Sequence, residues 1–96
     1  MEIPDLLRRK RKEILQIASA HGANNVRIFG SAARGDTGKD SDIDFLVDME
    51  PGRSLLDLGA LMLDLQDTLG RDVDVVTEDS IYWILRRRVL KEAIPL

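Results

Sequence analysis

The sequence predicts an α/β domain in which helices pack on a small mixed sheet of three or four strands. Long segments with apolar residues at helical spacing (3–20 and 54–69) alternate with short β-branched segments (26–29, 42–49 and 72–77). A long helix between the second and third strands favours a parallel pair, because parallel neighbours need a crossover. The short connection between the first and second strands favours an antiparallel pair.

Both long helices carry start and stop signals. Pro4 suits the first turn of the first helix, and Gly22 follows its end. The second helix is expected to start after Ser54, which forms a capping-box pattern with Asp57, and to end at Gly70. Its leucine-rich face is expected to be core and comprises Leu55, Leu58, Met62, Leu65 and Leu69.

Turn signals bound the strands. Asn24 and Asn25 predict a turn before the first strand, and Pro51-Gly52 predicts one after the second. A third long helix is expected over 80–91, although three consecutive arginines interrupt its apolar pattern.

Length and composition bound the class of protein. With 96 residues, the chain is expected to form one domain over 1–96, with a mostly aliphatic core because only 4% of residues are aromatic. The net charge of −3 argues against general nucleic-acid binding. There is no cysteine, and no run approaches the roughly 20 apolar residues that cross a bilayer. We therefore expect a cytoplasmic protein with no membrane partner, and homo-oligomers are left open.

Two carboxylates mark the start of the second strand. Asp42 and Asp44 are two residues apart, so they project on one face while Ile43 turns to the core. Such close anions repel each other unless a cation lies between them. A hard divalent ion with oxygen ligands would resolve this conflict.

The third strand repeats the pattern with Asp72 and Asp74. We prefer Asp74 as a third ligand, because valines flank it and it lies further inside the strand. Three aspartates on one face can hold two Mg²⁺ ions, an arrangement used in phosphoryl chemistry.

A Gly-Ser pair precedes these acids by about ten residues. Gly30 allows close approach of backbone to a ligand, and a short helix opening at Ser31 would direct its amides and hydroxyl at phosphate oxygens. Arg34 or Lys39 would add a cation beside the phosphates. Together these patterns indicate a site for a nucleoside triphosphate and metal.

The stretch FGSAARGDTGKDSDID resembles the signature of the DNA polymerase beta-like nucleotidyltransferases. Nearly the whole chain resembles their smallest branch, the minimal nucleotidyltransferases, which includes the MntA-like antitoxins of HEPN/MNT toxin–antitoxin pairs. The resemblance implies that Gly30 and Ser31 bind nucleotide phosphates and that Asp42, Asp44 and Asp74 bind Mg²⁺. It also implies a HEPN-domain RNase toxin as partner, neutralised by transfer of AMP from ATP to a tyrosine.

Three hypotheses stay open at this point. The first is the AMP-transferring antitoxin, which suits a chain too short to hold its own acceptor site. The second is a nucleotidyltransferase acting on a small molecule or an RNA end. The third is an antitoxin that neutralises its partner by stoichiometric binding without turnover.

Some features have no assigned role. His21 is expected at the surface beside a helix end, and the basic clusters 8–12 and 86–88 are either solvated faces or contacts for an acidic partner. Tyr82 and Trp83 fit either the core or an interface.

Overall fold

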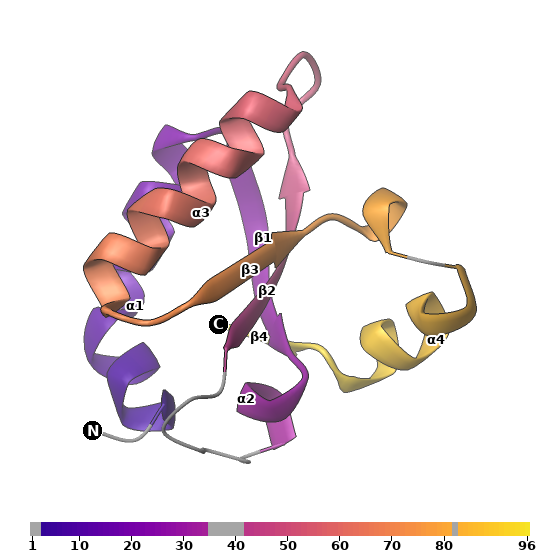
Figure 1. The fold of residues 1–96 in the computed structure, drawn as a ribbon, viewed down its shortest axis with the longest axis horizontal. Coiled ribbons are helices and arrows are strands. Elements are labelled where there is room, and N and C mark those ends of the chain that lie inside the picture. Colours follow the sequence, from indigo (N-terminus) through magenta and orange to yellow (C-terminus); the bar gives the residue numbers. More distant parts are fainter. Residues whose placement is uncertain (1–2, 35–41, 82) are drawn as a thin grey trace.

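The computed structural model describes residues 3–34, 42–81 and 83–96. Within these residues, helices and strands alternate along the chain, and the strands form one four-stranded sheet (Figure 1). The elements in chain order are α1 (Ile3–Ala20), β1 (Ala23–Phe29), α2 (Ser31–Arg34), β2 (Ile43–Met49), α3 (Leu55–Leu69), β3 (Val73–Val76), a short 3₁₀ helix η1 (Glu78–Ser80), α4 (Trp83–Glu92) and β4 (Ile94–Pro95).

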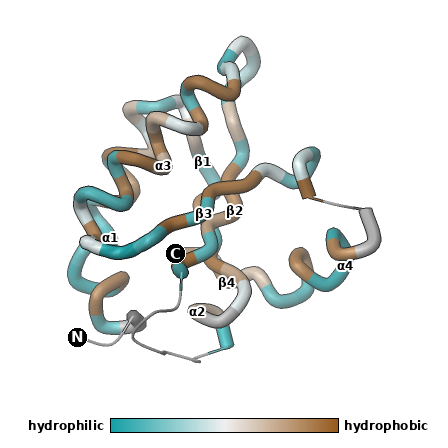
Figure 2. The backbone as a smooth tube through the Cα atoms, viewed as in Figure 1, coloured by the Kyte–Doolittle hydropathy of each residue, from teal (hydrophilic) through white to brown (hydrophobic). Residues whose placement is uncertain are grey.

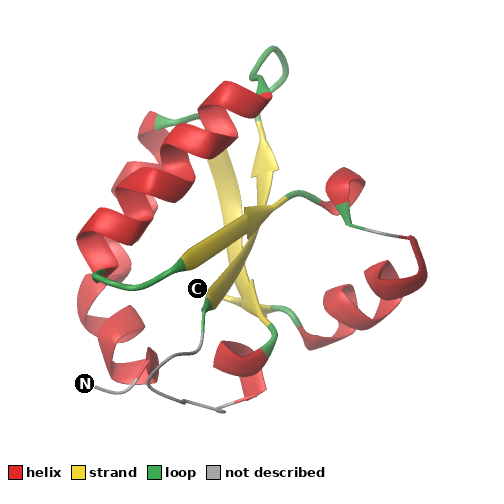
Figure 3. Cartoon of the chain, viewed as in Figure 1, coloured by secondary structure: helices red, strands yellow, loops and turns green. Residues whose placement is uncertain are grey.

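The sheet is mixed, as the connection lengths predict. Its strand order is β3-β2-β1-β4, with β2 and β3 parallel and both other pairs antiparallel. The fourth strand is only two residues long and pairs with Arg27 and Ile28 of β1. Figure 3 shows the strands crossing the centre of the molecule with the helices around them.

The core lies between one face of the sheet and helices α1 and α3. Figure 2 shows apolar segments of both helices beside apolar strands. Ile43 and Phe45 on β2 are fully buried, and Ile14 on α1 and Leu61 on α3 are buried against the same cluster. Aliphatic side chains dominate this cluster, in agreement with the composition.

The expected core face of α3 is only partly correct. Leu65 and Leu69 are buried, but Leu61, which spacing alone did not single out, is the most buried of the helix. Leu55 is 82% exposed because it stands in the first turn, where it lines a surface hollow instead of the core.

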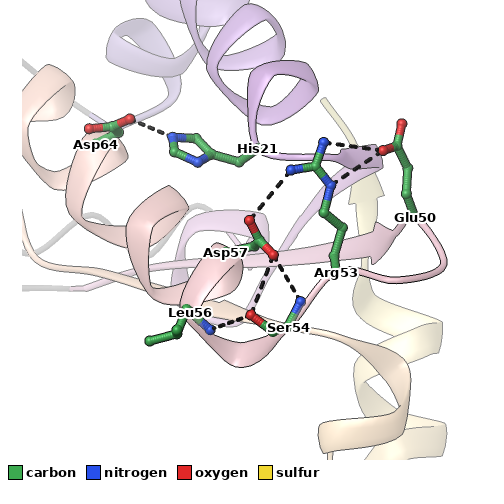
Figure 4. A network of polar contacts seen from close by, with 7 residues as sticks. All are labelled: His21, Glu50, Arg53, Ser54, Leu56, Asp57 and Asp64. Atoms are coloured by element: carbon green, nitrogen blue, oxygen red, sulfur yellow. Dashed lines mark hydrogen bonds and ion pairs between the residues drawn. The ribbon is translucent and has the colours of Figure 1, made fainter.

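Both ends of α3 are formed by local interactions that the sequence predicts, and Figure 4 shows those at its start. The Ser54 side chain accepts a hydrogen bond from the Leu56 amide at 3.2 Å, and the Asp57 carboxylate accepts one from the Ser54 amide at 2.9 Å. These bonds complete the capping box. Gly70 takes a left-handed conformation after the last turn.

Asn24 and Asn25 do not form the expected turn. They lie within β1, where the register with β2 shifts between Asn24 and Arg27, and Asn25 has a positive φ of 50°. Asparagine tolerates this conformation, so the same residue type that favours a turn also favours a bulge inside a strand.

The expected helix over 80–91 begins later, at Trp83. The Ser80 hydroxyl donates to the Thr77 carbonyl at 2.9 Å and accepts from the Thr77 amide at 3.0 Å, which closes η1 as a separate turn. Tyr82 lies outside the described residues.

His21 follows α1 and contacts Asp64 of α3, so its interaction is with a side chain rather than only with the helix end (Figure 4). This contact joins the two helices that cover the sheet. Among the described helices, none combines the length and the apolar character needed to cross a membrane.

Candidate active site

Strands β2 and β3 bring side by side two of the aspartates that the sequence predicts as metal ligands. Asp44 and Asp74 are paired in the parallel register, and the neighbouring Ile43 and Val73 are both buried in the core. Because side chains alternate along a strand, the two carboxylates lie on the opposite face of the sheet, away from α1 and α3. Asp42 is exposed and stands one residue before β2 begins.

Electrostatic repulsion acts at this pair. Burial raises the pKa of the Asp44 carboxyl above its ordinary value, and the negative charges of Asp74 and Asp42 raise it further. Arg34 acts in the opposite direction and lowers this pKa. The three aspartates are therefore close enough to interact, and a cation among them would remove the repulsion.

Gly30 places backbone directly against Asp44. Phe29 pairs with Asp44 across β1 and β2, and Gly30 follows it with a positive φ of 70°. A Cβ atom at position 30 would collide with the Oδ2 atom of Asp44. The position therefore requires glycine both for its conformation and for the space beside the carboxylate.

The short helix after Gly30 starts at Ser31, as the sequence predicts. The Arg34 amide donates to the Gly30 carbonyl at 3.1 Å, which closes the turn. Ala32 is buried and anchors the turn against the core. Backbone of the Gly-Ser turn and the carboxylates of β2 and β3 are thus neighbours.

Arg34 lies at the edge of this region. Its guanidinium pairs with Glu92 of α4 at 3.3 Å, and the two residues are 58 positions apart in the chain. The sequence contains no local signal for Glu92, since the two residues meet only in the folded chain. Lys39 lies outside the described residues.

The donor chemistry fits a hard divalent ion, since carboxylate oxygens are the ligands that Mg²⁺ prefers. In the part of the chain that the structure describes, no three His, Cys, Asp or Glu side chains converge closely enough to hold a metal ion. The geometry therefore shows a paired and repelling set of acids rather than a closed three-carboxylate cage.

A surface hollow of about 450 Å³ lies elsewhere, towards the other end of β2. It is lined by residues of the β2–α3 connection, the first turns of α3 and η1, and includes none of Asp42, Asp44 and Asp74. The acids lie instead on the face of the sheet opposite α1 and α3.

The model of the nucleotidyltransferase domain family matches residues 7–96. The chain belongs to the nucleotidyltransferase family. This nucleotidyltransferase is 44% identical over 84 residues to a predicted protein adenylyltransferase of Methanocaldococcus jannaschii (MJ0435), covering 88% of this chain and 90% of the relative. It is 36% identical over 93 residues to the protein adenylyltransferase MntA of Thermococcus cleftensis, covering 97% and 91% of the two chains.

Solved structures agree with the fold. A structure described as a minimal nucleotidyltransferase superposes with a TM-score of 0.88 at 48% identity, covering all of this nucleotidyltransferase and 97% of that chain. A chain from a toxin–antitoxin crystal structure with AMP-PNP superposes with a TM-score of 0.75 at 23% identity, covering 88% and 69%, and this likeness concerns the fold alone. The expected family, its minimal MntA-like branch and the enzyme class are confirmed.

Proposed function

We propose that this nucleotidyltransferase transfers AMP from ATP to a tyrosine hydroxyl of a HEPN-type toxin and acts as its antitoxin. The observation that carries the proposal is the pairing of Asp44 with Asp74 beside the backbone of Gly30. The relatives named protein adenylyltransferase support transfer to a protein. The low-identity toxin–antitoxin structure, named with AMP-PNP, is consistent with an ATP substrate.

In this proposal, each part of the site has one task. The backbone at Gly30 and Ser31 holds the triphosphate, and Arg34 adds positive charge near it. Asp42, Asp44 and Asp74 hold Mg²⁺, and the bound ion would neutralise the triphosphate and lower the pKa of the acceptor hydroxyl.

The transfer step follows from this placement. The tyrosine oxygen forms a bond to the α-phosphorus of ATP, and the bond from that phosphorus to the bridging oxygen of the β-phosphate breaks. Pyrophosphate leaves with the electron pair, and the hydroxyl proton passes to solvent. The chain's residues orient the phosphates for this in-line displacement.

Intact mass measurement tests the proposal. The protein is incubated with ATP, Mg²⁺ and the product of the adjacent gene, and the partner is expected to gain mass in steps of one AMP. The Asp42→Asn, Asp44→Asn double variant should give no added mass while circular dichroism shows an unchanged fold. Ser31→Ala should mainly weaken ATP binding, measured by calorimetry.

The same experiment distinguishes the alternatives. A tight complex with no mass change would instead support neutralisation by binding alone. An unrelated neighbour with no complex would point to a small molecule or an RNA end as the acceptor. Labelling of the partner by the double variant would show that the aspartates do not carry the reaction.

A further inference from the structure

Helix α4 stands apart from the core. It lies across the sheet from α1 and α3 (Figure 1), on the side to which Asp44 and Asp74 point. Among the described side chains, every buried core residue comes from other elements. The side chains of residues 85–92 in α4 therefore add no buried residue to that core.

Ion pairs connect α4 to the rest of the fold instead. Near its start, Arg86 pairs with Glu78 at 3.6 Å, and Glu78 also pairs with the mostly buried Arg27 of β1 at 3.1 Å. At its end, Glu92 pairs with Arg34 at 3.3 Å and with Arg88 at 3.2 Å. Because Arg34 is the last residue of α2, the short helix that follows Gly30, this ion pair joins the end of α4 to the edge of the site.

Two basic residues of α4 take no part in these contacts. Arg87 and Lys91 are exposed and form no ion pair with any described residue. They are four positions apart, so they share one face of the helix. Leu90 adjoins them at 39% exposure, and Leu85 on the same helix is 50% exposed. We call Arg87, Leu90 and Lys91 the α4 stripe.

The charge of the stripe is opposite to that of the protein. Helix α4 carries four basic residues and one acidic residue in a chain of net charge −3. A surface that combines two cations with exposed leucine complements an acidic protein segment that also carries an apolar side chain. A nucleic acid would match the cations but leave the leucines without a partner, and the acidic remainder of the chain would repel it.

We propose that the α4 stripe is the docking surface for the acceptor protein. The stripe binds an acidic, partly apolar segment of that protein and so brings its hydroxyl towards Asp44 and Asp74. This inference rests on the proposed function.

Charge reversal tests the docking surface. In the Arg87→Glu, Lys91→Glu variant, we expect the Kd for the adjacent-gene product and the acceptor KM for AMP transfer to rise at least about tenfold, with kcat little changed. The Kd for Mg²⁺–ATP should stay the same. The loss should be larger at low salt, because screening already weakens these contacts at high salt.

A matched control is available on α1. Arg9 and Lys12 are also exposed without an ion pair to any described residue, so Arg9→Glu, Lys12→Glu changes the net charge equally at another place. This control should leave acceptor binding unchanged. The milder Arg87→Gln, Lys91→Gln variant serves if the reversal perturbs the fold by circular dichroism, and it should raise the acceptor Kd by a smaller factor.

Three outcomes would contradict the docking surface. The first is that the α4 and α1 variants bind the acceptor equally well. The second is a raised Kd for ATP in the α4 variant, because this would assign the stripe to nucleotide binding. The third is binding of an RNA oligonucleotide that depends on the stripe while acceptor binding does not.

If the wild-type protein binds the adjacent-gene product but never transfers AMP to it, the proposed function fails and the docking surface is still tested by the Kd values. If the wild-type protein does not bind the neighbour, both proposals fail.

Discussion

At Gly30, the absence of a side chain is required by two independent features. The residue has φ of 70°, and a Cβ atom would meet the Asp44 carboxylate. Burial raises the pKa of Asp44, and the negative charges of Asp74 and Asp42 raise it further. The ionised form of Asp44 is therefore disfavoured in the metal-free protein, and a bound cation would remove this destabilisation.

Gly30→Ala should damage both folding and transfer. We expect a loss of about 1–3 kcal/mol in the free energy of unfolding, because the left-handed backbone and the clash add together. Transfer of label from α-³²P-ATP should fall by about tenfold or more, since Asp44 must move. Gly52→Ala is the matched control, because Gly52 has φ of 88° but no atom within 4 Å of an added Cβ. Equal losses in both variants would show that backbone strain alone matters at Gly30.

Asp44→Asn should stabilise the metal-free protein while abolishing transfer. Because the folded-state pKa of Asp44 is raised above its ordinary value of 3.8, ionisation of Asp44 costs stability as pH rises through that range. The variant should therefore match the wild type at low pH and exceed it at pH 7. The gain should be on the order of half a kcal/mol, discounted for screening by water.

Urea unfolding at pH 3 to 8 measures this gain, with Asp67→Asn on the exposed side of α3 as a control for loss of one negative charge. A variant less stable than the wild type at pH 7 without metal would contradict the assigned cause of the pKa shift.

At the scale of elements, local sequence signals predicted helix ends correctly where a few adjacent residues form all the hydrogen bonds of the cap. The capping box at Ser54 and the left-handed Gly70 both formed as expected, since all the groups involved lie within one helix end. The signal at Asn24 and Asn25 failed because asparagine suits a turn and a strand bulge equally. Only pairing with β2 decides between them.

Ser54→Ala should destabilise the fold without affecting the chemistry. Loss of the side-chain cap is expected to cost about 1 kcal/mol in the free energy of unfolding. The kcat for AMP transfer should be unchanged, since the cap stands away from Asp44 and Asp74. Ser19→Ala, an exposed serine inside α1, should be neutral or slightly stabilising. A fall in kcat under conditions where Ser54→Ala is fully folded would link the cap to the site.

At the scale of the whole molecule, the two sides of the sheet are held in different ways. Helices α1 and α3 bury aliphatic side chains on one face, whereas α4 is joined to the other side by ion pairs and the short β4. Exposed and half-exposed ion pairs contribute little to stability. Leu46 of β2 is buried on the side that carries the aspartates, and ligand binding to these acids should stabilise that side further.

Mg²⁺–ATP should stabilise the protein by mass action. At a hundredfold excess over Kd, binding to the folded state adds about 2.7 kcal/mol to the free energy of unfolding, and the Tm should rise accordingly. ATP with EDTA should give a smaller rise, because the aspartates then repel the triphosphate. Thermal unfolding measures both, with the Asp42→Asn, Asp44→Asn variant as control. An equal rise with and without Mg²⁺ would argue against metal bridging of ATP and the acids.

The sequence by itself determined the α/β class with its small mixed sheet, the directions of the main strand pairs and the likeness of its Gly-Ser and Asp-x-Asp pattern to the nucleotidyltransferases. These follow from periodicity, connection length and short motifs, which are local properties of the chain. Tertiary structure alone decided that Asp74 stands in register with Asp44, that Glu92 meets Arg34, and that α4 stands beside the site with Arg87 and Lys91 exposed. Such contacts join residues far apart in the chain, so their partners are selected only when the sheet and its helices pack together.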